Sequence, residues 1–216
     1  MLTLSHITYR VKDSGTTGAG KETEILSDIN LDLNERFVAI TGPNGSGKST
    51  LARLIAGIIR PTEGRILLDG QDITDMSVTD RARAGISYAF QQPVRFKGLT
   101  VRDLLTLAAG KPLSMGEACE YLSEVGLCAK EYVNREVNAS LSGGELKRME
   151  IAMILARGTK FSVFDEPEAG IDLWSFQNLI GVFRNMYEQT HGTILIISHQ
   201  ERILDIADRV IVLSGG

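Results

Sequence analysis

Hydrophobic and polar positions follow two periods along the chain, one typical of strands and one typical of helices. Near the N-terminus apolar and polar residues alternate, and later short continuous apolar runs indicate fully buried strands. We predict strands at residues 2–11, 25–33, 36–40, 65–70, 85–90, 160–164, 193–197 and 209–213. Longer segments rich in helix-forming residues predict helices at residues 51–59, 78–84, 100–109, 114–125, 145–156, 173–189 and 201–207.

The order of these elements predicts an α/β fold. Strands alternate with helices over most of the chain, which is typical of a mainly parallel sheet covered on both faces. The N-terminal strands predict an additional antiparallel β portion. Between residues 93 and 156 the pattern contains helices and no strand. We therefore predict one domain over residues 1–216, with a core of 1–92 and 157–216 and a helical subdomain inserted at about 93–156.

The clearest candidate chemistry lies between a predicted strand and a predicted helix. This stretch fits the phosphate-binding pattern G-x-x-x-x-G-K-[ST] and reads Gly42-Pro43-Asn44-Gly45-Ser46-Gly47-Lys48-Ser49-Thr50. Unpaired N–H groups and the dipole of a helix start both favour a phosphate anion. We expect Lys48 to reach the β- and γ-phosphates and the Ser49 hydroxyl to bind Mg²⁺. A glycine-rich turn with a solvated lysine is the simpler alternative.

Two acids follow the buried strand predicted at residues 160–164. Asp165 at the end of this strand suits a second contact to Mg²⁺, and Glu166 would be placed to polarise an attacking water. An ordinary strand end with two solvated acids is the alternative.

A hydroxyl and two glycines precede the helix predicted at residues 145–156, in the run Leu141-Ser142-Gly143-Gly144-Glu145. This arrangement predicts a second anion site, with a simple capped helix start as the alternative. Lys147 and Arg148 place positive charge in the first turn, where the helix dipole disfavours it. The mismatch predicts an anion or an acidic partner nearby.

Composition narrows the classes of function. The 23 basic and 27 acidic residues are mixed along the chain and give a net charge of −4, which argues against a nucleic-acid-binding surface. Cys119 and Cys128 are too few for a disulfide framework, so we expect buried thiols in a reducing cytoplasm. No apolar run reaches the roughly 20 residues that cross a bilayer. A membrane process would therefore need a separate membrane-spanning chain.

The order and spacing of the motifs resemble the ATP-binding-cassette (ABC) ATPases over essentially the whole chain. Three motifs carry this resemblance: the P-loop, the Leu-Ser-Gly-Gly-Glu run and the Asp-Glu pair. Tyr9, Gln91, Asp172 and Ser198-His199 occur before, between and after them in the order that the family has. The resemblance implies a RecA-like P-loop NTPase fold and hydrolysis of ATP with Mg²⁺. It also implies a head-to-tail homodimer with two ATP molecules between the subunits.

The same resemblance implies a role for each matching residue. Tyr9 would stack on adenine, and residues 42–50 would hold the phosphates. Ser49, Gln91 and Asp165 would contact the metal. Glu166 would act as the catalytic base, assisted by Lys48, Gln91 and His199. The ATP of the second subunit would be bound by a set of residues from the other motifs, namely Ser142, Gly143, Gly144 and Asp172.

Finer resemblances point to two kinds of partner. Gln92, Gly170 and Arg202 with their neighbours resemble the ATPase subunit of the SUF iron–sulfur cluster assembly machinery, which implies soluble scaffold proteins and a cytoplasmic complex. The alternative is the ATP-binding subunit of a membrane transporter, peripheral to the membrane through a permease docked at residues 93–96.

A nucleotide-dependent switch or DNA-repair clamp is a third hypothesis. It is disfavoured by the lack of a long heptad insert or basic face, and by the presence of both Glu166 and His199.

Overall fold

A computed structural model of the chain describes residues 1–12, 22–92, 94–137 and 141–216. Its strands are β1 (Leu2–Lys12), β2 (Glu22–Leu33), β3 (Phe37–Thr41), β4 (Glu63–Leu68), β5 (Gln71–Asp72), β6 (Ile86–Ala89), β7 (Phe161–Asp165), β8 (Thr193–Ile197) and β9 (Arg209–Val212). Its helices are α1 (Lys48–Ala56), α2 (Val78–Ala84), α3 (Val101–Ala109), α4 (Met115–Glu124), α5 (Ala129–Tyr132), α6 (Gly143–Arg157), α7 (Leu173–Gln189) and α8 (Glu201–Leu204).

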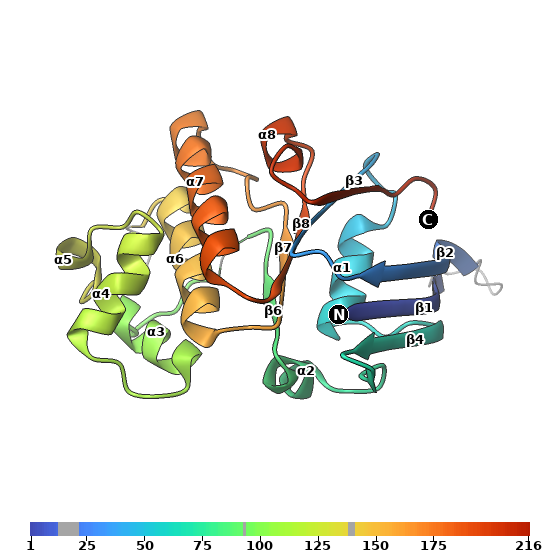
Figure 1. Cartoon of the computed structure of the whole chain (residues 1–216), viewed down its shortest axis with the longest axis horizontal. Coiled ribbons are helices and arrows are strands. Elements are labelled where there is room, and N and C mark those ends of the chain that lie inside the picture. The colour runs from blue at the N-terminus through green and yellow to red at the C-terminus, as the bar shows by residue number, and fades with distance from the viewer. Residues whose placement is uncertain (13–21, 93, 138–140) are drawn as a thin grey trace.

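The strands form two sheets of different kinds (Figure 1). An antiparallel sheet has the order β2-β1-β4-β5, and a sheet whose strands pair in parallel has the order β6-β7-β8-β3-β9. Helices α3 to α6 come between β6 and β7 in the chain. The predicted α/β fold, with a parallel core and an N-terminal antiparallel portion, is therefore confirmed.

Two hydrophobic cores hold these layers together. In one core, α1 packs through Leu51 and Leu54 between the inner faces of the two sheets, against residues such as Leu4 and Val163. In the other, α6 and α7 cover the opposite face of the parallel sheet, and α3 and α4 extend this core outward. Because β3, β7 and β8 are buried along their lengths, their carboxyl ends are held in fixed positions at one edge.

Several element ends differ from the prediction for local reasons. Helix α1 stops at Ala56 because Gly57 adopts the left-handed conformation that ends helices, so the apolar Ile58 and Ile59 lie outside it. The short elements β5 and α5 carry too few residues to produce a periodic signal. The prediction that both thiols are buried is wrong, since Cys119 is half-buried and Cys128 is exposed.

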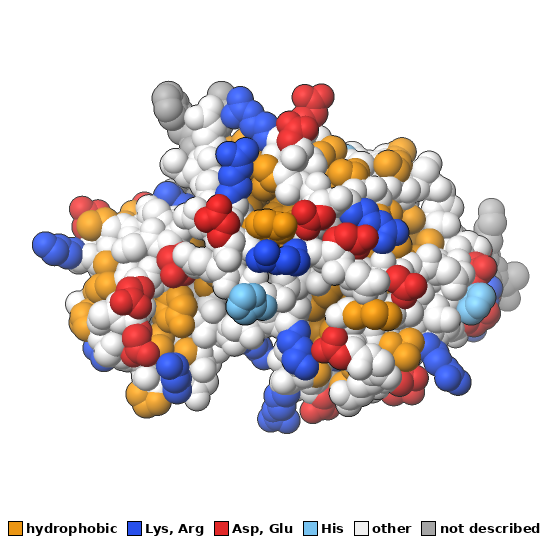
Figure 2. All heavy atoms as spheres, viewed as in Figure 1, with side chains coloured by type: hydrophobic (Ala, Val, Ile, Leu, Met, Phe, Trp, Pro, Cys, Tyr) orange, Lys and Arg blue, Asp and Glu red, His pale blue; other side chains and the backbone are white. Residues whose placement is uncertain are grey.

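The surface carries charges of both signs. On the face in Figure 2, acidic and basic side chains are interspersed among neutral ones. Among the described residues, no helix combines the length and the apolar character needed to cross a membrane.

Candidate functional site

The predicted phosphate-binding loop connects the end of β3 to the start of α1. A side chain at Gly42 would place its Cβ 1.9 Å from the carbonyl oxygen of Leu213, and one at Gly47 would meet the Leu26 side chain at 2.6 Å. Gly47 also has a φ of 94°, which favours glycine. Glycine is therefore required at both positions for the loop to wrap closely at the helix start.

Polar groups of this loop are arranged as an anion site would need. The Lys48 ammonium is buried and donates to the carbonyl oxygens of Gly42 and Pro43 at 2.8 and 2.9 Å. The Ser46 hydroxyl is buried with no hydrogen-bond partner, and the Cβ position of Gly45 faces open space. A phosphate group fits these residues, because it would supply the missing acceptor and the counter-charge for Lys48.

Two of the three predicted Mg²⁺ contacts, Ser49 and Asp165, meet at the carboxyl end of β7, while the third residue, Gln91, contacts Glu166. The Ser49 hydroxyl donates to Asp165 Oδ1 at 2.9 Å, and the Tyr88 hydroxyl donates to Asp165 Oδ2 at 2.9 Å. Hydroxyl and carboxylate oxygens are the hard ligands that Mg²⁺ prefers, so these residues fit the ion. The role of Tyr88 was not predicted. Burial and the Asp165 charge raise the pKa of Tyr88, which keeps the phenol protonated as a donor to Asp165.

Glu166 follows Asp165 in a strained backbone conformation. Its φ is 47°, in the left-handed region, which costs a non-glycine residue about 1–3 kcal/mol. The N–H of Glu166 donates to the carbonyl oxygen of Ile197 at 3.0 Å, which ties this turn to the end of β8. Gln91 Nε2 donates to Glu166 Oε2 at 2.6 Å. Two residues that are 75 positions apart in the sequence are thus brought into direct contact.

His199 lies just beyond the end of β8 and its side chain is exposed. The preceding Ser198 hydroxyl donates to the Glu168 carboxylate and accepts the N–H of Gln200 at 3.0 Å. Burial raises the pKa of Glu168, and its bond to Ser198 opposes that effect. This link was not predicted, because nothing in the local sequence pairs the two residues. It holds the segment that carries His199 against the turn after Glu166.

Tyr9 is connected to the phosphate-binding loop through Leu26. It lies on β1 opposite Leu26 of β2, the residue whose side chain occupies the space beside Gly47. Tyr9 is partly buried and packs against the core that contains α1. Its predicted contact with adenine stays a prediction.

The predicted second anion site is the start of α6. Ser142 caps this helix: its hydroxyl accepts the N–H of Glu145 at 3.2 Å, while Glu145 accepts the N–H of Ser142 at 2.6 Å. The Cβ position of Gly143 lies 3.5 Å from the carbonyl oxygen of Gly170. Gly144 is buried, and Asp172 is exposed just before α7.

Strands β6 and β7 lie between α6 and α1 (Figure 1). The predicted contacts of Ser142, Gly143, Gly144 and Asp172 to a second subunit's ATP stay predictions.

Comparisons with known proteins agree on one family. Residues 26–169 match the ABC transporter family. An uncharacterized ABC transporter ATP-binding protein of Methanocaldococcus jannaschii is 41% identical over 203 residues, covering 89% of this chain and 80% of the relative. The lipopolysaccharide export system ATP-binding protein LptB of Haemophilus influenzae is 31% identical over 203 residues, covering 91% and 83%.

A solved structure supports the same conclusion. The ATP-binding cassette MJ0796, in a dimeric post-hydrolysis state bound to ADP and Pi, superposes with a TM-score of 0.85 at 26% identity, covering 100% of this chain and 95% of that one. The predicted P-loop NTPase fold and ATPase activity are thereby confirmed. The chain belongs to the ABC transporter family and is an ABC ATPase that uses ATP with Mg²⁺.

Proposed function

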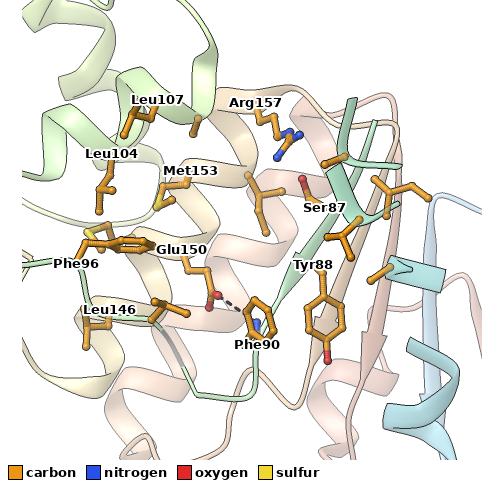
Figure 3. A pocket seen from close by; sticks show the side chains of 18 of the residues that line it. Ser87, Tyr88, Phe90, Phe96, Leu104, Leu107, Leu146, Glu150, Met153 and Arg157 are labelled. Atoms are coloured by element: carbon orange, nitrogen blue, oxygen red, sulfur yellow. Dashed lines mark hydrogen bonds between the residues drawn. The ribbon is translucent and has the colours of Figure 1, made fainter. Parts of the chain in front are cut away.

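We propose that the chain is the ATP-hydrolysing subunit of a membrane transporter and works as a head-to-tail homodimer. The observation that carries this proposal is an apolar groove beside Gln91, with a volume of about 450 Å³. Helices α3 and α6 form one wall of the groove, and β6 with the segment after it forms the other (Figure 3). Leu104, Leu146 and Met153 point into it from the helices.

The groove exposes large apolar side chains. Phe90, Val94 and Leu107 are 45%, 48% and 67% exposed. Exposed apolar surface gathered in a groove is typical of a binding site for another protein, and an apolar helix face is a common occupant of such grooves. Residues 93–96 were predicted to dock a permease. Pro93 lies outside the described residues, while Val94 and Phe96 line the groove.

The names of the relatives favour a transporter as the source of that helix. They are transporter or export-system ATP-binding proteins. The dimeric state of the solved cassette supports the homodimer. These observations favour the permease over the SUF-type scaffold as the partner.

In this proposal each residue of the site has a separate role in the hydrolysis of ATP. Lys48 and the N–H groups of the loop would hold the phosphates, and Ser49 and Asp165 would hold Mg²⁺, which would supply positive charge beside the phosphates. Glu166 accepts the proton of the attacking water, and Gln91 and His199 orient that water. Ser142, Gly143, Gly144 and Asp172 serve the ATP of the second subunit, while Tyr9 stacks on adenine.

The SUF-type assembly role remains the alternative function. It rests on the resemblance of Gln92, Gly170 and Arg202 with their neighbours, and it predicts soluble partners.

Photocrosslinking in the native cell distinguishes the two partners. A photoreactive amino acid replaces Leu107 in the groove, and a matched control replaces Val212, which is 69% exposed on the edge strand β9. The transporter proposal predicts an adduct with a polytopic membrane protein from position 107 and not from position 212. An adduct with soluble scaffold proteins alone would contradict it and support the SUF-type role.

A further inference from the structure

Side chains from one helix, α6, hold the backbone of residues 90–92, which are called the Gln91 segment below. The Lys147 ammonium donates to the carbonyl oxygens of Phe90 and Gln91 at 2.8 and 2.6 Å. Three residues further along α6, Glu150 Oε1 accepts the N–H of Phe90 at 3.1 Å, as the dashed line in Figure 3 marks. An anion or an acidic partner was predicted beside the basic start of α6, and the direct partners of Lys147 are carbonyl oxygens of the same chain, with acidic side chains nearby. Both polar backbone groups of Phe90 are satisfied by α6.

Lys147 is an unusual residue to bury. It is only 3% exposed, and burial lowers its pKa, opposed by the charges of Glu150, Glu168, Asp165 and Glu166. A charged side chain is rarely buried unless partners compensate for its lost hydration. Here two carbonyl oxygens supply direct partners, and the acids of the site supply favourable charge. An apolar side chain at this position would leave both carbonyl oxygens without their donor.

The position of Gln91 depends on this backbone. The segment from Phe90 to Gln92 follows the end of β6 and belongs to no helix or strand, and all three of its residues are exposed. The Gln91 side chain nevertheless reaches Glu166 Oε2 at 2.6 Å. The bonds from Lys147 and Glu150 to this backbone fix the point from which the side chain extends.

We propose that Lys147 is a positioning residue for ATP hydrolysis, which holds the backbone of Phe90 and Gln91 so that the Gln91 side chain stays against Glu166. The proposal rests on the roles of Glu166 and Gln91 in the proposed function. Lys147 belongs to the same helix whose start, at Ser142, is predicted to serve the second subunit's ATP. A movement of α6 would therefore carry the Gln91 anchor with it.

Arg148 provides a matched control on the same helix. Its guanidinium donates to the carbonyl oxygen of Gly126 at 3.3 Å, before α5, and it makes no hydrogen bond to the Gln91 segment. Replacing Arg148 by methionine removes the same charge from the next residue of the same helix. Any general effect of losing a basic residue from α6 is then measured separately from the effect on Gln91.

A double-mutant cycle on the purified full chain tests the proposal. Lys147→Met should lower kcat for MgATP about tenfold or more while the Kd for ATP stays within about twofold, because a misplaced group affects the reaction more than binding. Gln91→Ala should cause a similar loss, and adding Lys147→Met to it should cause no further loss. Lys147→Arg, which retains several donors, should recover part of the activity.

A structural measurement complements the kinetics. Hydrogen exchange of the peptide that covers residues 86–92 should be faster in Lys147→Met than in the parent or in Arg148→Met. If Lys147→Met fails to fold, Lys147→Gln, which keeps a neutral donor, is used in the same cycle.

Two results would overturn the proposal: additive losses in the double mutant, or equal losses in Lys147→Met and Arg148→Met. Failure of the proposed catalytic site is recognised separately, because Glu166→Gln would then hydrolyse ATP like the parent.

Discussion

Glu150, which lines the groove, makes the stability of the protein depend on pH. Burial raises the pKa of its carboxyl group from 4.5 to about 7, while Lys147 and the N–H of Phe90 oppose this rise. The folded state therefore holds the proton more tightly than the unfolded state does. The free energy of unfolding is unaffected by this group well below pH 4.5 and falls as the pH rises from 4.5 to 7.

The size of the effect follows from the two pKa values. At about 1.4 kcal/mol for each unit of pKa, a rise from 4.5 to about 7 corresponds to a penalty of about 3 kcal/mol above pH 7. Glu150→Gln removes the charge and retains a carbonyl oxygen that can accept the N–H of Phe90. The variant should therefore be more stable than the parent by about 3 kcal/mol at pH 8 and by less than about 1 kcal/mol at pH 4.5.

Urea unfolding followed by circular dichroism at both pH values measures this difference. Glu131→Gln on α5 is the control, since this exposed glutamate should change the free energy of unfolding by less than about 0.5 kcal/mol at either pH. An equal gain for Glu150→Gln at pH 4.5 and pH 8, or a loss at pH 8, would refute the reasoning that burial of the charged carboxylate destabilises the fold.

Three further predictions concern single residues. Lys48→Ala should weaken MgATP binding about tenfold or more in calorimetric titration, because charge-assisted bonds to the phosphates are lost; unchanged affinity would remove the phosphate-binding assignment. Asp165→Asn should raise the Mg²⁺ concentration needed for half-maximal hydrolysis, whereas an unaltered requirement would exclude Asp165 as a ligand. Arg81→Met should lower the free energy of unfolding by about 3 kcal/mol, since the buried guanidinium donates to the carbonyl oxygens of Leu54, Ile55 and Thr74. A change below about 1 kcal/mol in urea would contradict that role.

Features that depend on neighbouring residues could be predicted from the sequence. The helix predicted at residues 100–109 is an example: the Thr100 hydroxyl accepts the N–H of Asp103, and α3 begins at the next residue. The parallel core followed from the buried strands and their alternation with helices. The order of the motifs predicted one site from distant residues, and the structure brings Ser49 to Asp165 and Gln91 to Glu166.

Features that depend on how distant elements meet could not be predicted. Tyr88 reads as one more residue of a buried strand, and its bond to Asp165 exists only because β6 and β7 pair in parallel. Lys147 was interpreted as a charge beside an anion or an acidic partner, since nothing local indicates that its ammonium reaches the carbonyl oxygen of Phe90. A long side chain can reach many partners, and the packing of α6 selects one of them.

Glu166 is the residue on which the proposed hydrolysis depends most directly. Its strained backbone, its contact with Gln91 and its place beside Asp165 support the role of catalytic base. The measurement is single-turnover hydrolysis of MgATP by Glu166→Gln, with ATP affinity and the dimer measured on the same sample. We predict ATP affinity within about twofold of the parent, accumulation of an ATP-bound dimer, and hydrolysis slowed by about 100-fold or more. Hydrolysis at the parent rate would show that Glu166 is not the base and would contradict the account of the site.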